Sequence, residues 1–142
     1  MSTDGGDHWS DPIKVSQTPP RADPGNEQAS VPGVDVSDDG TIAVTYYDFR
    51  FNTSAPGVPT DHWMVHCHPS ATTTCADAGD WGDEVRLTDT SFDVEQLPFA
   101  RGPFGYFVGE YEGLTSTGNA FRPLFAMGTG NRLTDIVTVT VG

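Results

Sequence analysis

The stretch SVPGVDVSDDGTIAVTYYDF, residues 30–49, decides the fold class of this chain. Alternation at 30–37 and the β-branched and aromatic residues at 41–49 are typical of strands. The Asp-Gly pair within DDG (38–40) is typical of the tight turn that joins two antiparallel strands. The stretch therefore predicts a β-hairpin, and almost nothing elsewhere in the chain has a helical pattern.

Other segments repeat this pattern between loops rich in Gly, Pro, Ser and Asn. The further predicted strands are 12–17, 62–68, 83–89, 104–116, 119–127 and 134–141. They form one four-stranded meander over 30–90 and three strands of a second over 91–142, preceded by one short strand within 1–29. Repeated four-stranded meanders of about 40–50 residues are typical of β-propeller blades. The sequence predicts an all-β, antiparallel protein that forms a single partial β-propeller of about two blades.

The charge balance excludes several partners. The chain carries 20 acidic residues against seven Lys and Arg residues, a formal net charge of −13 at pH 7. Nucleic acids and anionic membranes require clustered Lys and Arg, and no run approaches the roughly 18 apolar residues of a membrane span. No signal peptide is present in the sequence. We expect no cofactor, with Ca²⁺ left open because carboxylates are its ligands, although no EF-hand-like spacing locates a site.

The two cysteines flank a short polar loop. Cys67 and Cys75 enclose HPSATTT (68–74), and a disulfide there would add about 2–3 kcal/mol of stability. It would place the protein outside the cytoplasm. Free thiols are one alternative, and a Cys/His metal site that includes His66 and His68 is another. Alternation along a strand directs both histidines to one face and Cys67 to the other, which argues against that metal site.

The opening residues STDGGDHW (2–9) resemble the Asp-box, or BNR repeat, of the sialidase-like β-propellers. The pattern S-x-D-x-G-x-T-W matches at Ser2, Asp4, Gly6 and Trp9, with His8 in place of threonine. In that family the box is the hairpin between the third and fourth strands of a blade. The resemblance implies that serine and aspartate side chains cap backbone N–H groups, that glycine takes a positive φ, and that Trp9 packs beneath the turn.

Further stretches extend the resemblance along the chain. A degraded box lies within TTTCADAGDWG (72–82), where Trp81 keeps the tryptophan position. VDVSDDGTIAVTYYDFR (34–50) and FVGEYEGL (107–114) are similar to elements of secreted bacterial members of the family. The resemblance therefore implies a secreted or cell-surface bacterial protein, with glycan or protein ligands.

Sialidases of this fold are glycosidases with a tyrosine nucleophile, a glutamate beside it, an aspartate acid/base and three arginines on the substrate carboxylate. The resemblance implies catalytic candidates at Tyr47, Asp48, Glu110 and Tyr111, and substrate-binding candidates at Arg50 and Arg122. Structural roles compete with these assignments. Asp48 and Arg50 also suit an ion pair that holds a loop, and alternation places Glu110 and Glu112 on the face opposite Tyr111. Other polar residues are expected to be structural, with Arg86 on the surface of its strand and His62, His66 and His68 on an edge-like strand without a triad partner.

Two functional interpretations follow. The chain is either part of an extracellular sialidase-like hydrolase whose site is completed by other blades, or a non-catalytic propeller module that binds glycans or proteins. We favour the second for the chain as it stands, because three arginines cannot be assigned to one site, and the hydrolase-like interpretation for the parent protein. The predicted partners within an assembly are the remaining blades or a head-to-tail copy of the chain. In either assembly 134–141 is expected to pair with 12–17.

Overall fold

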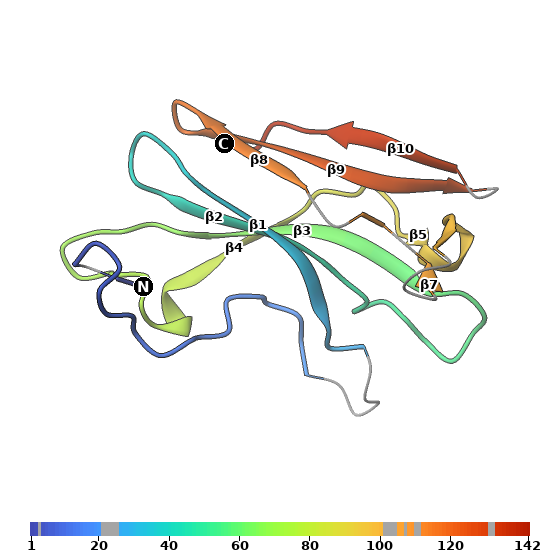
Figure 1. Cartoon of the computed structure of the whole chain (residues 1–142), viewed down its shortest axis with the longest axis horizontal. Helices are drawn as coiled ribbons and strands as arrows, with labels where there is room; N and C mark the ends of the chain where they lie inside the picture. Colours follow the sequence, from blue (N-terminus) through green and yellow to red (C-terminus); the bar gives the residue numbers. More distant parts are fainter. Residues whose placement is uncertain (3, 21–25, 101–104, 107, 110–111, 131–132) are drawn as a thin grey trace.

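The structure is a computed structural model that describes residues 1–2, 4–20, 26–100, 105–106, 108–109, 112–130 and 133–142 (Figure 1). It is all-β with antiparallel strands, as predicted. In this part of the chain the helical segments are two single 3₁₀ turns, Ala78–Asp80 and Val94–Gln96. None of the described helices is long and apolar enough to cross a membrane.

The predicted four-stranded meander is confirmed. Its strands are β1 (Ala29–Val36), β2 (Ile42–Asp48), β3 (Pro59–Cys67) and β4 (Trp81–Arg86), hydrogen-bonded in that order. The DDG turn joins β1 to β2 as the sequence predicts, with Gly40 at a φ of +85°. Asp39 Oδ1 accepts a hydrogen bond from Thr41 N at 3.0 Å, which closes the turn.

A second sheet follows, in the order β10-β9-β8. Its strands are β8 (Gly113–Thr117), β9 (Ala120–Gly130) and β10 (Leu133–Thr138). The segment predicted as one strand over 104–116 is divided, because β7 (Gly105–Tyr106) pairs with β6 (Phe99–Ala100) instead. A short β5 (Phe92–Asp93) adds to β3, a pairing that the sequence pattern does not indicate.

The predicted strand over 12–17 is wrong. These residues have no ladder partner in the structure, and prolines on both sides, Pro12 and Pro19, remove backbone donors. The segment is held by side chains instead, since Gln17 N donates to the Tyr46 hydroxyl at 2.8 Å. In the described residues β10 pairs with β9 alone, so the expected pairing of 134–141 with 12–17 does not form within this chain.

The first sheet buries both of its faces at the central strands β2 and β3. One face packs against the second sheet through a core of Tyr47, Met64, Phe92, Phe121 and Phe125, with Ala43, Leu87 and Leu97. We call this contact the seam. The other face carries Tyr46, Trp63 and Val65 under the N-terminal segment. Because neighbouring strand residues point to opposite faces, Tyr46 and Tyr47 contribute to different cores.

Candidate functional site

Asp48 lies in a buried polar cluster at the end of β2, on the face away from the seam. Its side chain is fully buried and accepts four hydrogen bonds, one of them from the backbone N of Arg50 to Oδ1 at 3.3 Å. Trp63 Nε1 donates to Oδ1 at 2.9 Å, while Thr18 Oγ1 and Arg50 Nε donate to Oδ2 at 2.7 and 2.6 Å. The carboxylate is therefore occupied by groups of this chain.

Arg50 joins Asp48 to a second carboxylate. Its two terminal nitrogens bond the two oxygens of Glu84 at 2.6 and 2.8 Å, a bidentate contact. The Tyr46 hydroxyl also donates to Glu84, and the guanidinium carbon of Arg50 lies 3.6 Å from the centre of the Trp63 ring. Burial alone would lower the pKa of Arg50, but the hydrogen bonds to Glu84 and Asp48 outweigh it and raise that pKa. Arg50 therefore forms the ion pair with Asp48 that holds its loop, which is the structural role considered in the sequence analysis.

A second buried carboxylate lies beside the first. Asp61 is the cross-strand neighbour of Asp48 in register, and its side chain is also buried. Arg86 Nε and one terminal nitrogen donate to Asp61 Oδ1 at 2.9 and 2.6 Å, and Thr88 Oγ1 and Ser91 Oγ donate to the two oxygens. The expectation that Arg86 is a plain surface residue is wrong, because it neutralises this carboxylate. We refer to Tyr46, Asp48, Arg50, Asp61, Trp63, Glu84 and Arg86 as the charged face.

Tyr47 points into the seam rather than toward Asp48. Its side chain is buried, and its hydroxyl donates to the carbonyl of Ala126 on β9. Burial, followed by the charge of Glu112, raises the pKa of Tyr47 well above its usual range. The expected shared site of Tyr47 with Asp48 and Arg50 is therefore wrong, since the sheet separates them.

A close contact between a buried imidazole and a buried carboxyl group lies next to Tyr47. His62 Nε2 is 2.6 Å from Glu112 Oε2, and both side chains are almost wholly excluded from solvent. The His62 ring lies between Tyr47 and Phe125, with ring centres 4.4 and 4.3 Å away. The expectation that this strand is edge-like is wrong, because β3 lies between β2 and β4 in the sheet.

The remaining predicted site residues do not join either cluster. Arg122 is exposed on β9, next to the buried Phe121, and so faces away from the seam. The structure therefore does not bring Arg122 to Arg50, which lies beyond the other face of the first sheet. Glu110 and Tyr111 lie outside the described residues.

The N-terminal turn has the local geometry that its motif implies. Ser2 Oγ accepts from Gly6 N at 2.8 Å, and Asp4 Oδ1 accepts from His8 N at 3.0 Å. Gly6 takes a φ of +100°. The backbone and side chain of His8, in that order, lower the pKa of Asp4 to about 2.

Trp9 departs from the expected packing. It is 73% exposed, and its Nε1 donates to Gly6 O at 3.0 Å. The prediction that it packs beneath the turn is wrong, because the turn is held by hydrogen bonds within residues 1–10. Trp81 is half-buried and donates in the same way to Cys75 O at 3.2 Å.

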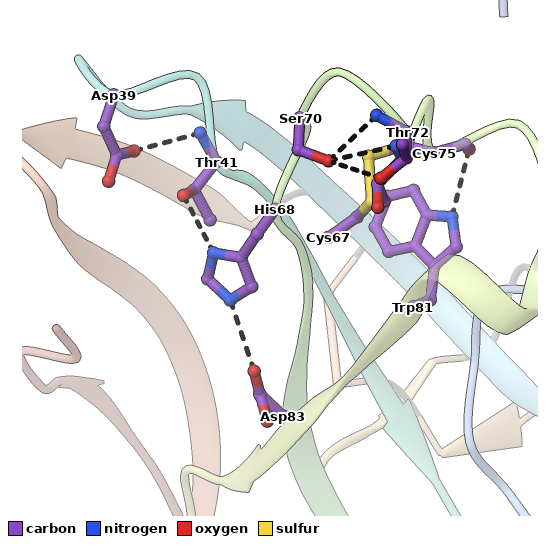
Figure 2. The surroundings of a disulfide bond; sticks show 10 residues. Asp39, Thr41, Cys67, His68, Ser70, Thr72, Cys75, Trp81 and Asp83 are labelled. Atoms are coloured by element: carbon purple, nitrogen blue, oxygen red, sulfur yellow. Dashed lines mark hydrogen bonds and ion pairs between the residues drawn. A yellow bond between two sulfur atoms is a disulfide. The ribbon is translucent and has the colours of Figure 1, made fainter.

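The predicted disulfide between Cys67 and Cys75 is present (Figure 2). As alternation requires, His66 and His68 lie together on the other side of the strand, with ring centres 6.0 Å apart. They border a cavity of about 480 Å³ that also contains Asp83. Across the described residues, no group of three or more His, Cys, Asp or Glu side chains is placed so that it could hold a metal ion.

Comparisons of the chain with protein families, with curated proteins and with solved structures find no match. What these clusters can do chemically is therefore inferred from their geometry alone. On the charged face two arginines bind three carboxylates of the same chain, and the seam buries a tyrosine, a histidine and a glutamate. Both clusters stabilise packing, and neither presents a reactive group to solvent.

Proposed function

We propose that this chain is a non-catalytic module of an extracellular Asp-box β-propeller, which binds a glycan or protein ligand or supports neighbouring blades that do so. One observation carries the proposal. The two candidate catalytic residues that the structure describes, Tyr47 and Asp48, are buried on opposite faces of one sheet with their polar atoms engaged. They cannot act together on one substrate in this arrangement.

The physical requirements of glycosidase chemistry strengthen this argument. A tyrosine nucleophile must reach the substrate and lose its proton to a nearby base. Tyr47 donates to a backbone carbonyl in the seam, and its raised pKa disfavours the phenolate. The Arg50 guanidinium already binds two carboxylates of its own chain, so it has little capacity for a substrate carboxylate.

A sialidase-like hydrolase completed by further blades is the second candidate. The proximity of Glu112 to Tyr47 favours it, because a tyrosine beside a glutamate is the pair that the family resemblance implies. This alternative requires the second sheet to move away and expose the pair.

Hydrolysis of a fluorogenic sialoside separates the two candidates. We expect no turnover above a protein-free control, and the same result for Tyr47→Phe. A glycan array probed with the disulfide-bonded protein tests the binding role directly, with heat-unfolded protein as the control. Turnover that Tyr47→Phe abolishes would reject the proposal and establish the hydrolase.

A further inference from the structure

A cavity of about 300 Å³ lies between the N-terminal segment and the disulfide loop. Most of its walls are apolar, and the side chains that matter most here are Trp9, Pro12, Ile13, Val15 and Trp81. We call this cavity the tryptophan pocket. Small-molecule sites are mostly apolar with a few polar groups, and this volume is at the lower end of their range. Neither the charged face nor the seam includes these residues, so the pocket needs a separate explanation.

Trp9 is held in place although most of its surface is exposed to solvent. Its bond from Nε1 to Gly6 O fixes the ring on a turn that Ser2 and Asp4 close with further hydrogen bonds. An exposed ring adds little to the packing of the protein. A fixed tryptophan instead supplies a large, rigid contact surface to a ligand at low cost in conformational entropy.

Trp81 is fixed on the disulfide side of the pocket. Its Nε1 donates to Cys75 O, and Cys75 is buried and bonded to Cys67 (Figure 2). The indole also packs against the buried cluster beneath the N-terminal segment. Because the indole N–H groups of Trp9 and Trp81 both bond backbone carbonyls, the two rings offer a ligand their carbon surfaces and no donor.

The polar groups of the pocket are mainly hydrogen-bond acceptors. Asp11 lines the pocket, and no described residue donates a hydrogen bond to its carboxylate. Ser10 Oγ, also in the lining, accepts from the amino group of Met1 at 2.5 Å. Among the described residues that line the pocket there is no Lys or Arg. A suitable ligand therefore has an apolar face and hydroxyl donors, and carries no anionic group to meet Asp11.

A pyranose sugar has this combination of groups. Its C–H bonds form an apolar face, and the negative face of an aromatic ring attracts such weakly positive hydrogens. Its hydroxyl groups can donate to a carboxylate. A proline-rich peptide, another ligand of aromatic-lined grooves, lacks the backbone N–H donors that these acceptors require.

We propose that the tryptophan pocket binds a neutral sugar of a glycan, which stacks on Trp9 and donates hydroxyl hydrogen bonds to Asp11. This inference rests on the proposed binding function and gives that function a site and a ligand class. It also predicts that the chain prefers neutral sugars to sialylated ones, because Asp11 repels a sialic acid carboxylate.

A glycan array that carries neutral oligosaccharides beside their sialylated counterparts tests the ligand class. Neutral members should bind the disulfide-bonded protein more strongly than their sialylated counterparts. The best neutral oligosaccharide is then titrated into ¹⁵N-labelled protein, with decaproline titrated in parallel. The sequence contains three tryptophans, so the indole N–H signals locate the site. The signals of Trp9 and Trp81 should shift, whereas that of Trp63, which is buried and bonded to Asp48, should not.

Variants of Trp9 separate stacking from the order of the turn. Trp9→Ala should weaken binding at least about fivefold, the lower end of what loss of a stacked aromatic ring costs with nucleobases. Trp9→Phe also loses the bond to Gly6 O but keeps a ring face, so it should bind more tightly than Trp9→Ala. Asp11→Ala should weaken binding as well. Phe99→Ala, which removes an exposed aromatic on β6 outside the pocket, is the matched control and should leave the affinity unchanged.

Several results would overturn the tryptophan pocket as a sugar site. These are an array without a bound neutral glycan, preferred binding of decaproline or of sialylated glycans, and equal affinities of Trp9→Phe and Trp9→Ala. A neutral glycan that Trp9→Ala binds as tightly as the wild type would also reject this site, but it would leave the proposed binding function standing. Turnover of a sialoside would instead reject that function itself.

Discussion

The charged face and the seam bury the two sides of one sheet by opposite means. The charged face pairs Asp48 and Asp61 with Arg50 and Arg86, and its bonds join the first sheet, its loops and the N-terminal segment. The seam is mostly aromatic and aliphatic, and its residues come from both sheets. Because side chains alternate along β2, Tyr46 and Asp48 lie on the charged face. Tyr47, between them, lies in the seam.

The charged face and the seam therefore have different roles, one in ordering loops and the other in joining the two sheets. A charged cluster contributes stability only while every partner is present, because an unpaired buried charge is costly. An apolar contact contributes in proportion to the area that it removes from water. We therefore expect the charged face to fix the conformation of the loops at the strand ends, and the seam to hold the two sheets together.

Phe125→Ala should give the largest loss of stability. Phe125 is 2% exposed in the seam, so the truncation leaves a cavity and should lower the free energy of unfolding by about 3–5 kcal/mol. Leu124→Ala, the exposed neighbour on β9, is the control and should cost under about 0.5 kcal/mol. Urea unfolding of both variants measures the difference, and equal losses would contradict the assignment of the seam as the main contact.

Asp48→Asn should have the next largest effect. The change keeps the shape of the side chain but removes the charge that Arg50, Thr18 and Trp63 contact, at a cost of about 3 kcal/mol. Asp135→Asn on the exposed strand β10 is the control and should be close to neutral. If Asp48→Asn were also neutral in urea unfolding, the charged face would be unnecessary for stability.

The fold class could be predicted because local signals agreed with it. The DDG turn and the alternation of 41–49 fix the β1-β2 hairpin, and TGN (117–119) does the same between β8 and β9. The strand predicted at 12–17 failed because alternation alone cannot show whether a ladder partner exists. Two-residue strands such as β5 are too short to give any periodic signal.

The site was only partly predictable, for a related reason. The Asp48–Arg50 pair is close in sequence and was recognised, whereas Glu84 reaches Arg50 from 34 residues away. Alternation could have suggested that Asp61 faces the same way as Trp63, but its partner Arg86 follows only from the register of β3 and β4. Long-range pairing of this kind depends on tertiary packing, which a single sequence does not encode in its spacing.

Two single variants, Tyr46→Phe and Tyr47→Phe, compare the charged face with the seam most directly, because each removes one hydroxyl group. Tyr46→Phe removes the donor to Glu84 and the acceptor of Gln17 N, and should cost about 1.5 kcal/mol. Tyr47→Phe removes only the donor to Ala126 O and should cost about 1 kcal/mol. Hydrogen exchange should also separate them, since only Tyr46→Phe should speed exchange at Gln17. Faster exchange there in Tyr47→Phe would contradict the independence of the two faces.

Loss of the Asp39 carboxylate should have the smallest effect on stability. Asp39 is exposed, so it serves as a comparison for the buried groups of the charged face and the seam. Its exposed carboxylate accepts from Ser37 Oγ at 2.6 Å and Thr41 N at 3.0 Å in the β1-β2 turn. These bonds, that of Ser37 first, lower its pKa from 3.8 to about 2. Because the folded-state pKa is the lower one, the stabilisation is complete above about pH 4 and is lost as the pH falls toward about 2.

Carboxyl NMR titration checks the Asp39 prediction residue by residue. The Asp39 signal should have its midpoint near pH 2 in the wild type and at a higher pH in Ser37→Ala, because that change removes the strongest donor while the Thr41 donors still lower the pKa. Asp39→Asn should destabilise the protein less than Asp48→Asn, since water can replace the lost partner at an exposed site. If the two changes cost the same, burial would not determine how much a carboxylate of the charged face contributes to stability.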